Sequence, residues 1–319
     1  MDLVIEKWPN PIFTVTLGAG KEEGGTRERS SKVGGETTLP YLFHDGDMPH
    51  KPVIAMEIWD IEPAEWPLVS KEPFKDVYKD PVKWAMKCVN EYKAEILCVK
   101  LQGTHPDFGN KSADEASNII KEISKVVKKP LIILGCGDDD KDNKVLSKVS
   151  VVLKGERCLL GDATQKNYKT LTASCLADGH NIIAESPIDI NIAKQINIMI
   201  NEMGLPLERI VINPTIGGLG YGIEYAYSIM ERARLAALNG DKMLSMPFVC
   251  FVGQEAWRAK EAKADTNEHP EWGDMNERGP LWEAQTAVAV LQSGADILIM
   301  RHPKAIESVK KYIDLLMRR

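Results

Sequence analysis

Eight short apolar runs, each followed by a longer segment of helical periodicity, constrain the fold of this chain more than any other feature of its sequence. The runs are rich in β-branched residues, and their alternation with helical segments is typical of a parallel sheet. Eight strands that are each followed by a helix make a (β/α)8 TIM barrel. We therefore predict an α/β chain with a TIM barrel over residues 51–319. The predicted strands span residues 53–58, 95–101, 131–134, 157–160, 181–184, 209–212, 248–252 and 296–300.

Start and stop signals support several of the helices independently of their apolar periodicity. Asp80 precedes Pro81, which places a capping residue before a proline at the first helical position. Ser112 and Glu115 have the spacing of a capping box. Gly204 follows a long helical segment over residues 188–203 and is expected to end that helix.

Residues 1–50 do not follow the strand and helix alternation, so we predict an N-terminal extension. Residues 12–17 alternate as a strand, and residues 31–39 could return beside them across a glycine-rich, charged tip. This pattern predicts a β-hairpin. Two placements remain open from the sequence, a plug in the barrel floor and an arm that docks on another chain.

Two connections that leave predicted strands are much longer than usual, over residues 59–79 and 253–279. Connections that enter strands are short, so we expect function at the carboxyl ends of the strands. Two readings of the aromatic content of these connections remain open, a surface for a large partner or flat ligand and a cap over the barrel's own end. The tryptophans in or beside them are Trp59, Trp66, Trp257, Trp272 and Trp282.

Charge and cysteine content exclude several classes of function. The chain has 46 acidic and 40 basic residues and a net charge of −6, so a nucleic-acid partner is not expected. It has no apolar run near the roughly 18 residues of a membrane span and no signal-like start, so we expect a cytoplasmic protein without a membrane partner. The six cysteines include no Cys-x-x-Cys pair, so we predict buried free thiols and no iron–sulfur cluster on this chain.

Polar residues at the predicted strand ends form the candidate site, because TIM barrels carry their chemistry there. His105 and His302 have the most versatile chemistry, but their spacing is not that of a metal site, and we predict neither a metal site nor a catalytic set. Residues 217–222 (GGLGYG) allow two readings, a backbone cradle for a ligand and a tight left-handed turn. The strand-end residues are Glu57, Asp60, Gln102, Thr104, His105, Asp162, Thr164, Glu185, Asn213, Gln254, Arg301 and His302.

Six longer stretches resemble one family, the small (delta) subunit of the corrinoid iron–sulfur protein of acetyl-CoA decarbonylase/synthase. Three of them are residues 13–27 (FTVTLGAGKEEGGTR), 33–36 (VGGE) and 213–225 (NPTIGGLGYGIEY). The others are residues 186–192 (SPIDINI), 242–247 (KMLSMP) and 255–261 (EAWRAKE). The resemblance therefore extends over essentially the whole chain.

The resemblance implies a TIM-barrel subunit that pairs with a large subunit carrying an iron–sulfur cluster and a corrinoid-binding domain. The corrinoid (cobalamin) would be shared between the subunits and lie over the barrel mouth. Its cobalt would take a methyl group from methyl-tetrahydrofolate on a separate methyltransferase and pass it to acetyl-CoA synthase. The residues that we expect to contact the corrinoid are Gln102, Thr104, His105, Asp162, Thr164, Asn213, Gln254, Arg301 and His302.

Two alternatives remain. The barrel could be a pterin-binding corrinoid methyltransferase in its own right, with Asp162 and Asn213 hydrogen-bonded to the pterin ring. It could also be a purely structural subunit that does not touch the cofactor. An Asp-x-His-x-x-Gly motif typical of cobalamin-binding domains is incomplete here, because Ile183 follows Asp178 and His180 where glycine is needed. The partner is therefore expected to hold the corrinoid tail.

Overall fold

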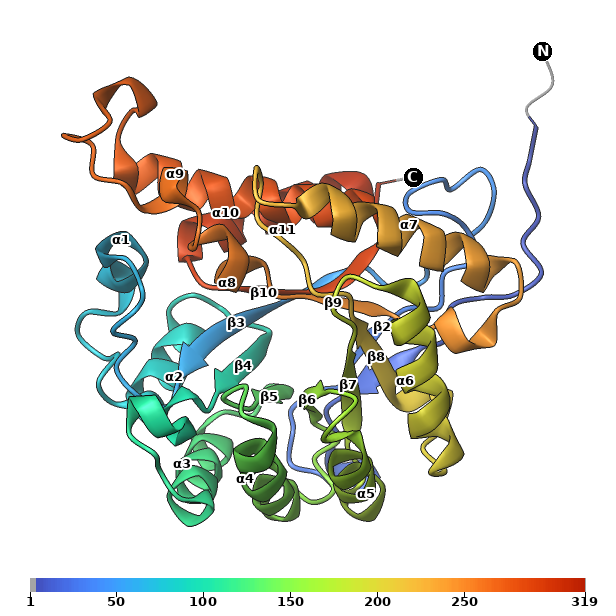
Figure 1. The fold of residues 1–319 in the computed structure, drawn as a ribbon, viewed down its shortest axis with the longest axis horizontal. Helices are drawn as coiled ribbons and strands as arrows, with labels where there is room; N and C mark the ends of the chain where they lie inside the picture. The colour runs from blue at the N-terminus through green and yellow to red at the C-terminus, as the bar shows by residue number, and fades with distance from the viewer. Residues whose placement is uncertain (1–3, 319) are drawn as a thin grey trace.

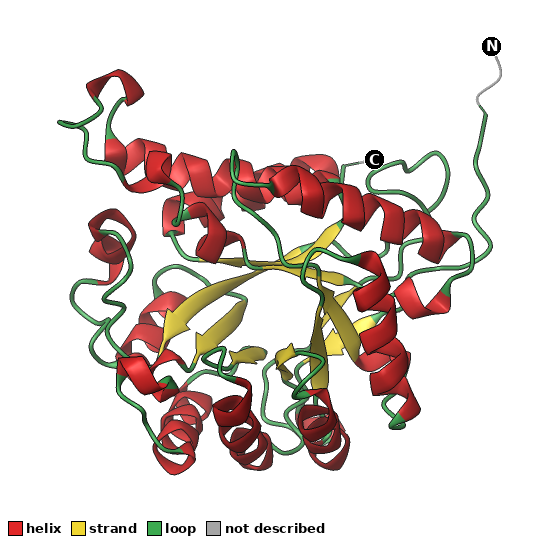
Figure 2. Cartoon of the chain, in the orientation of Figure 1, coloured by secondary structure: helices red, strands yellow, loops and turns green. Residues whose placement is uncertain are grey.

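Eight parallel strands close into a barrel at the centre of the protein, and helices surround it (Figures 1 and 2). The computed structural model describes residues 4–318. The strands pair in the closed order β10-β3-β4-β5-β6-β7-β8-β9, so the predicted TIM barrel is confirmed. They are β3 (Val53–Trp59), β4 (Ile96–Lys100), β5 (Leu131–Leu134), β6 (Leu159–Ala163), β7 (Asn181–Glu185), β8 (Ile210–Asn213), β9 (Phe248–Cys250) and β10 (Ala295–Met300).

The longer helices lie between successive strands. Two of the barrel strands, β6 and β9, differ from the predicted bounds by two or more residues at one end or both. β6 starts two residues late, because Arg157 has a left-handed backbone with φ of 48°, and β9 stops early because Val252 already opens a short helix. The longer helices are α2 (Pro81–Asn90), α3 (Ala113–Val126), α4 (Asp139–Val152), α5 (Tyr168–Asp178), α6 (Ile190–Glu202), α7 (Ile223–Leu238), α10 (Met275–Gln292) and α11 (Pro303–Leu316).

The capping signals read from the sequence form as expected. The Asp80 carboxylate accepts hydrogen bonds from the backbone N–H groups of Val82 and Lys83, both at 3.1 Å, at the start of α2. Ser112 and Glu115 form the reciprocal capping box at the start of α3. These bonds satisfy N–H groups that have no partner within the helix, and so they fix where each helix begins.

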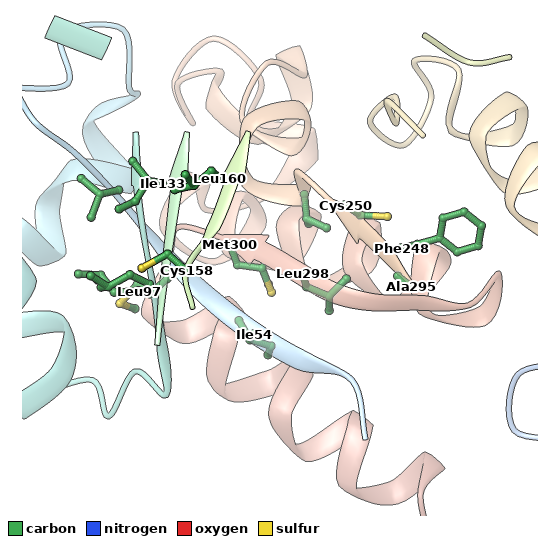
Figure 3. Packing of buried hydrophobic residues seen from close by; sticks show 14 of the residues in the cluster. Ile54, Leu97, Ile133, Cys158, Leu160, Phe248, Cys250, Ala295, Leu298 and Met300 are labelled. Carbon is green, nitrogen blue, oxygen red and sulfur yellow. The ribbon is translucent and has the colours of Figure 1, made fainter. Parts of the chain in front are cut away.

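Alternate residues of each strand pack into two separate layers. Leu97 and Val99 of β4 face the surrounding helices, whereas Ile96 and Cys98 face the inside of the barrel. Figure 3 shows part of the outer layer, where side chains such as Leu97 project from neighbouring strands. All six cysteines are buried and free, as the sequence predicts.

A two-stranded antiparallel sheet from the N-terminal extension closes the barrel floor. Its strands are β1 (Val15–Leu17) and β2 (Ser31–Val33), and the side chains of Val15, Leu17 and Val33 belong to the same buried cluster as the barrel interior. Asn181, the first residue of β7, donates a hydrogen bond to the Thr16 carbonyl at 2.8 Å. The hairpin therefore takes the first of the two placements left open by the sequence. The domain boundary at residue 50 stays a prediction.

A buried charged cluster fastens the extension to the barrel. Arg234 of α7 donates to Asp296 of β10 at 2.9 Å and reaches Glu36 of the extension at 3.5 Å. The Asp296 carboxylate also accepts the Phe248 backbone N–H at 2.7 Å. Burial, together with the nearby Asp296 carboxylate, raises the pKa of Glu36 well above its ordinary value. Two carboxyl groups thus face one guanidinium, and the raised pKa favours a proton on Glu36.

We expect Glu36→Gln to lower the free energy of unfolding by less than about 1 kcal/mol, because glutamine resembles a protonated glutamic acid. Asp296→Asn is expected to cost about 2 kcal/mol, since Asp296 accepts from a charged donor. Urea unfolding of both variants at pH 7 measures the difference. Equal losses in the two variants would contradict this assignment of the proton.

Candidate functional site

Two adjoining cavities open at the carboxyl ends of the barrel strands. They meet at four residues that line both, namely Lys100, Cys136, Gln254 and Arg258. The first, of about 300 Å³, is called the acidic cavity, and its other polar side chains are Asp139, Asp142, Asp162, Thr164, Asn167, Glu185, Asn213, Thr215 and Glu255. The second, of about 410 Å³, is called the cationic cavity, and its other lining residues are Trp59, Glu65, Trp66, Pro67, Gln102, His105, Trp257, Lys263 and Arg301.

Three neighbouring strands bring the central polar groups of the acidic cavity together. Asn213 at the end of β8 donates to Asp162 of β6 at 3.4 Å, and its carbonyl oxygen accepts the Thr215 backbone N–H. Burial and the neighbouring Glu185 carboxylate raise the pKa of Asp162 well above its ordinary value. Burial and Asp139 also raise the pKa of Glu185. These raised pKa values favour a proton on the Asp162–Glu185 pair.

The loop after β5 adds a further carboxylate to the acidic cavity. Asp142 accepts the backbone N–H groups of Cys136 at 2.8 Å and Gly137 at 2.9 Å. A Cβ atom at Gly135 would lie 2.3 Å from this carboxylate, so a larger residue there would displace Asp142. Burial raises the pKa of Asp142. The sequence reasoning assigned no site residue to this loop, although its position directly after a strand was a usable signal.

A buried ion pair forms one wall of the cationic cavity. The Arg301 guanidinium donates two hydrogen bonds of 2.9 Å to the Glu57 carboxylate. Burial alone would raise the pKa of Glu57, but the charge and hydrogen bonds of Arg301 hold it below its ordinary value. Glu57 also accepts from the Trp59 indole at 2.7 Å. The Arg301 guanidinium lies 4.4 Å from the centre of the Trp66 ring, so a cation–π contact supports the pair.

Glu283 of α10 holds a second part of the same wall. Its carboxylate accepts the Trp257 indole N–H at 2.9 Å and the backbone N–H groups of Arg301 at 2.5 Å and His302 at 3.0 Å. Burial raises the pKa of Glu283 to about 7, although these donors and the Arg301 charge oppose the shift. Nothing in the sequence pointed to Glu283, because it lies inside a helix and far from any strand end.

Lys100 stands at the junction of the two cavities. It is the last residue of β4, and its ammonium group donates to the Gln254 side-chain carbonyl at 3.0 Å. The ammonium also lies 5.7 Å from the centre of the Trp59 ring. Burial lowers the pKa of Lys100, while the Glu57 carboxylate opposes this shift. Lys100 therefore brings a cationic donor to both cavities.

Seven of the nine predicted contact residues line these cavities. Gln102, His105 and Arg301 line the cationic cavity, whereas Asp162, Thr164 and Asn213 line the acidic one, and Gln254 lines both.

The other two predicted residues, Thr104 and His302, line neither cavity and make hydrogen bonds that hold the backbone. The Thr104 hydroxyl donates to the Leu101 carbonyl at 2.7 Å, and His302 caps α11 by accepting the Lys304 N–H. Whether any of the nine contacts a corrinoid stays a prediction.

The structure also bears on the two motifs with open readings, for three of the five tryptophans and for the glycine-rich loop. Trp59, Trp66 and Trp257 are each only 3% exposed, so these three tryptophans mainly cap the barrel's own end. In the glycine-rich loop, Gly220 and Gly222 have φ values of 74° and 94°. No residue of positions 217–222 lines either cavity, and the loop is a left-handed turn.

Comparison with known proteins places this barrel in a family. The CO dehydrogenase/acetyl-CoA synthase delta subunit family matches residues 14–312. The chain belongs to this family. The delta subunit of the acetyl-CoA decarbonylase/synthase complex from Methanothermobacter thermautotrophicus is 37% identical over 308 residues, which cover 96% of this chain and 76% of that protein. The Archaeoglobus fulgidus delta subunit is 34% identical over 316 residues, which cover 98% and 70%.

Among solved structures, this delta-subunit family member is similar to dihydropteroate synthase from Xanthomonas albilineans, solved with 4-aminobenzoic acid. The TM-score is 0.57 and the sequence identity 11%, over 88% of this chain and 98% of that one. At this identity the similarity shows the TIM-barrel fold alone. Within residues 4–318, no group of three or more His, Cys, Asp or Glu side chains could hold a metal ion. No helix in the same range has the length and apolar character needed to cross a membrane.

Proposed function

We propose that this chain is the barrel subunit of a heterodimeric corrinoid iron–sulfur methyl carrier, with the corrinoid lying over the mouth. Its membership of the delta-subunit family over residues 14–312 carries this proposal. The partner would be a large subunit with the iron–sulfur cluster and the corrinoid-binding domain. The corrinoid would receive a methyl group from methyl-tetrahydrofolate on a separate methyltransferase. It would then pass that group to acetyl-CoA synthase.

The residues of the mouth fit such a cofactor. A corrin ring carries amide side chains, which need both donors and acceptors around an open rim. Gln102 and Gln254 supply amides, and Arg258 supplies a mostly exposed guanidinium. When bound, the corrinoid supplies the cobalt that carries the methyl group. The part of this chain would be to hold the ring edge and exclude water and oxidants from the face it covers.

Co-purification tests the proposal directly. The chain is expressed with and without its large subunit, and the corrinoid absorption of each preparation is recorded. We expect corrinoid in the complex and none on this chain alone. Corrinoid on the isolated chain would overturn the proposal. So would a large subunit that does not bind this chain and whose cobalt is oxidised as fast with this chain as without it.

Variants in the mouth separate a cofactor-contacting subunit from a purely structural one. Gln254→Ala and His105→Ala alter side chains that line the cationic cavity. A cofactor-contacting subunit predicts faster loss of corrinoid from the complex in these variants. Unchanged retention in both would favour the structural reading. Thr104 is a poor choice for this test, because it is buried and bonded to the Leu101 carbonyl.

The arrangement of the acidic cavity favours a second candidate function, a pterin-binding methyltransferase. Asp162, Glu185 and Asn213 place two carboxyl groups and an amide on adjacent strands, a set that can bond to the edge of a flat heterocycle. Binding of methyl-tetrahydrofolate to this chain alone, measured by calorimetry, would support it. The same titration with Asp162→Ala should then give at least about tenfold weaker binding.

A further inference from the structure

The cationic cavity holds more positive charge than its own carboxylates balance. Glu57 forms an ion pair with Arg301, and Glu255 forms one with Arg258 at 2.8 Å. Glu65 is the one carboxylate among the cavity's lining residues. Four cationic side chains line this cavity against that one carboxylate, namely Lys100, Arg258, Lys263 and Arg301.

Several N–H donors of these cations also lack an acceptor within the described residues. Lys100 has three donors and uses one, on Gln254. Arg301 bonds to Glu57 through Nε and Nη2, which leaves Nη1 without a hydrogen bond. The side chain of Lys263 at the end of α9 (Lys260–Lys263) makes no hydrogen bond or ion pair within residues 4–318. Charged N–H donors without an acceptor therefore reach this cavity from β4, from the residue after β10 and from α9.

The neighbouring acidic cavity differs from the cationic cavity in the charge of its lining. Four carboxyl groups line it, those of Asp139, Asp142, Asp162 and Glu185, and the negative charge that remains on them disfavours an anion there. An anion that reaches the mouth is therefore attracted to the cationic cavity rather than to the acidic one. A volume of about 410 Å³ is ample for a small oxyanion with part of its hydration shell.

We propose that the cationic cavity is a binding site for an oxyanion, a carboxylate or phosphate group, with Lys100 and the free Nη1 of Arg301 as its inner donors and Lys263 at its rim. This site shares the cationic cavity with side chains that we propose to contact the corrinoid, but it does not rest on that role. It needs no partner chain, so it can be measured on this chain alone.

Isothermal titration calorimetry of the full chain with orthophosphate and with succinate tests the site. Sodium chloride at matched ionic strength corrects for general screening. We expect saturable binding of at least one probe, and the tighter of the two identifies the oxyanion class. Lys100→Gln should weaken that binding about tenfold, as expected for loss of one charge-assisted hydrogen bond.

Matched lysine variants keep the test independent of folding defects. Lys263→Ala removes an exposed rim lysine and should weaken binding about threefold, the effect of a partly screened charge of below 1 kcal/mol. Lys144→Ala removes an exposed lysine of α4 that lines neither cavity and should leave binding unchanged. Absence of saturable binding by both probes, or equal weakening by Lys263→Ala and Lys144→Ala, would overturn the proposal. Either result leaves the corrinoid co-purification unaffected.

Discussion

Replacing Glu57 by alanine is expected to lower the free energy of unfolding by about 3–5 kcal/mol. Arg301 is only 5% exposed, and without Glu57 its guanidinium would remain buried with no counter-charge. The Trp59 indole would lose its acceptor as well. Urea unfolding, followed by circular dichroism at neutral pH, measures the loss.

Two further variants test whether the lost stability comes from the unpaired charge of Arg301. In the double variant Glu57→Met with Arg301→Met, both charges are gone, and most of the stability should return because no unpaired ion remains. Glu277→Ala breaks the exposed Lys304–Glu277 pair at 2.6 Å and should cost less than about 1 kcal/mol. A loss of this small size for Glu57→Ala would mean that the buried pair does not stabilise the mouth.

Acidification from pH 6.5 to pH 4 is expected to remove about 3 kcal/mol of stability through His302 alone. Burial lowers the pKa of His302 to about 4, below the value of 6.5 in an unfolded chain. In this window the unfolded state therefore binds more protons than the folded state, and stability falls as the pH falls. Protonation also places an N–H at Nδ1, which now accepts the Lys304 backbone N–H at the start of α11.

The variant His302→Asn isolates this contribution, because asparagine caps a helix and does not titrate. Urea unfolding of both proteins at several pH values gives two stability curves. We expect the difference between them to change by about 3 kcal/mol between pH 6.5 and pH 4. Parallel curves would show that His302 does not control the acid response.

The barrel was predictable because its signals are local and repeated. Each strand shows itself as an apolar run, and caps such as Asp80 and Ser112 act on neighbouring backbone groups. The ring of polar residues at the strand ends was also predictable, because parallel strands in a barrel end on one face.

The division of that ring into two cavities was not predictable from local signals. It depends on contacts between distant residues, such as Glu57 with Arg301 and Trp257 with Glu283. Position after a strand also did not distinguish Thr104, which holds its own turn, from Gln102, which lines a cavity. Lys100 was not among the candidate site residues, because its place between the cavities depends on Gln254, which lies 154 residues away.

The hairpin in the barrel floor has a kinetic consequence. Val15, Leu17 and Val33 fill the lower end, so a molecule held among the strand ends exchanges with solvent through the mouth. A second subunit seated on that mouth would then set the residence time of the molecule. Release would follow the tilting or departure of that subunit, and a mutation at the interface could change the exchange rate without altering a single contact inside the cavities.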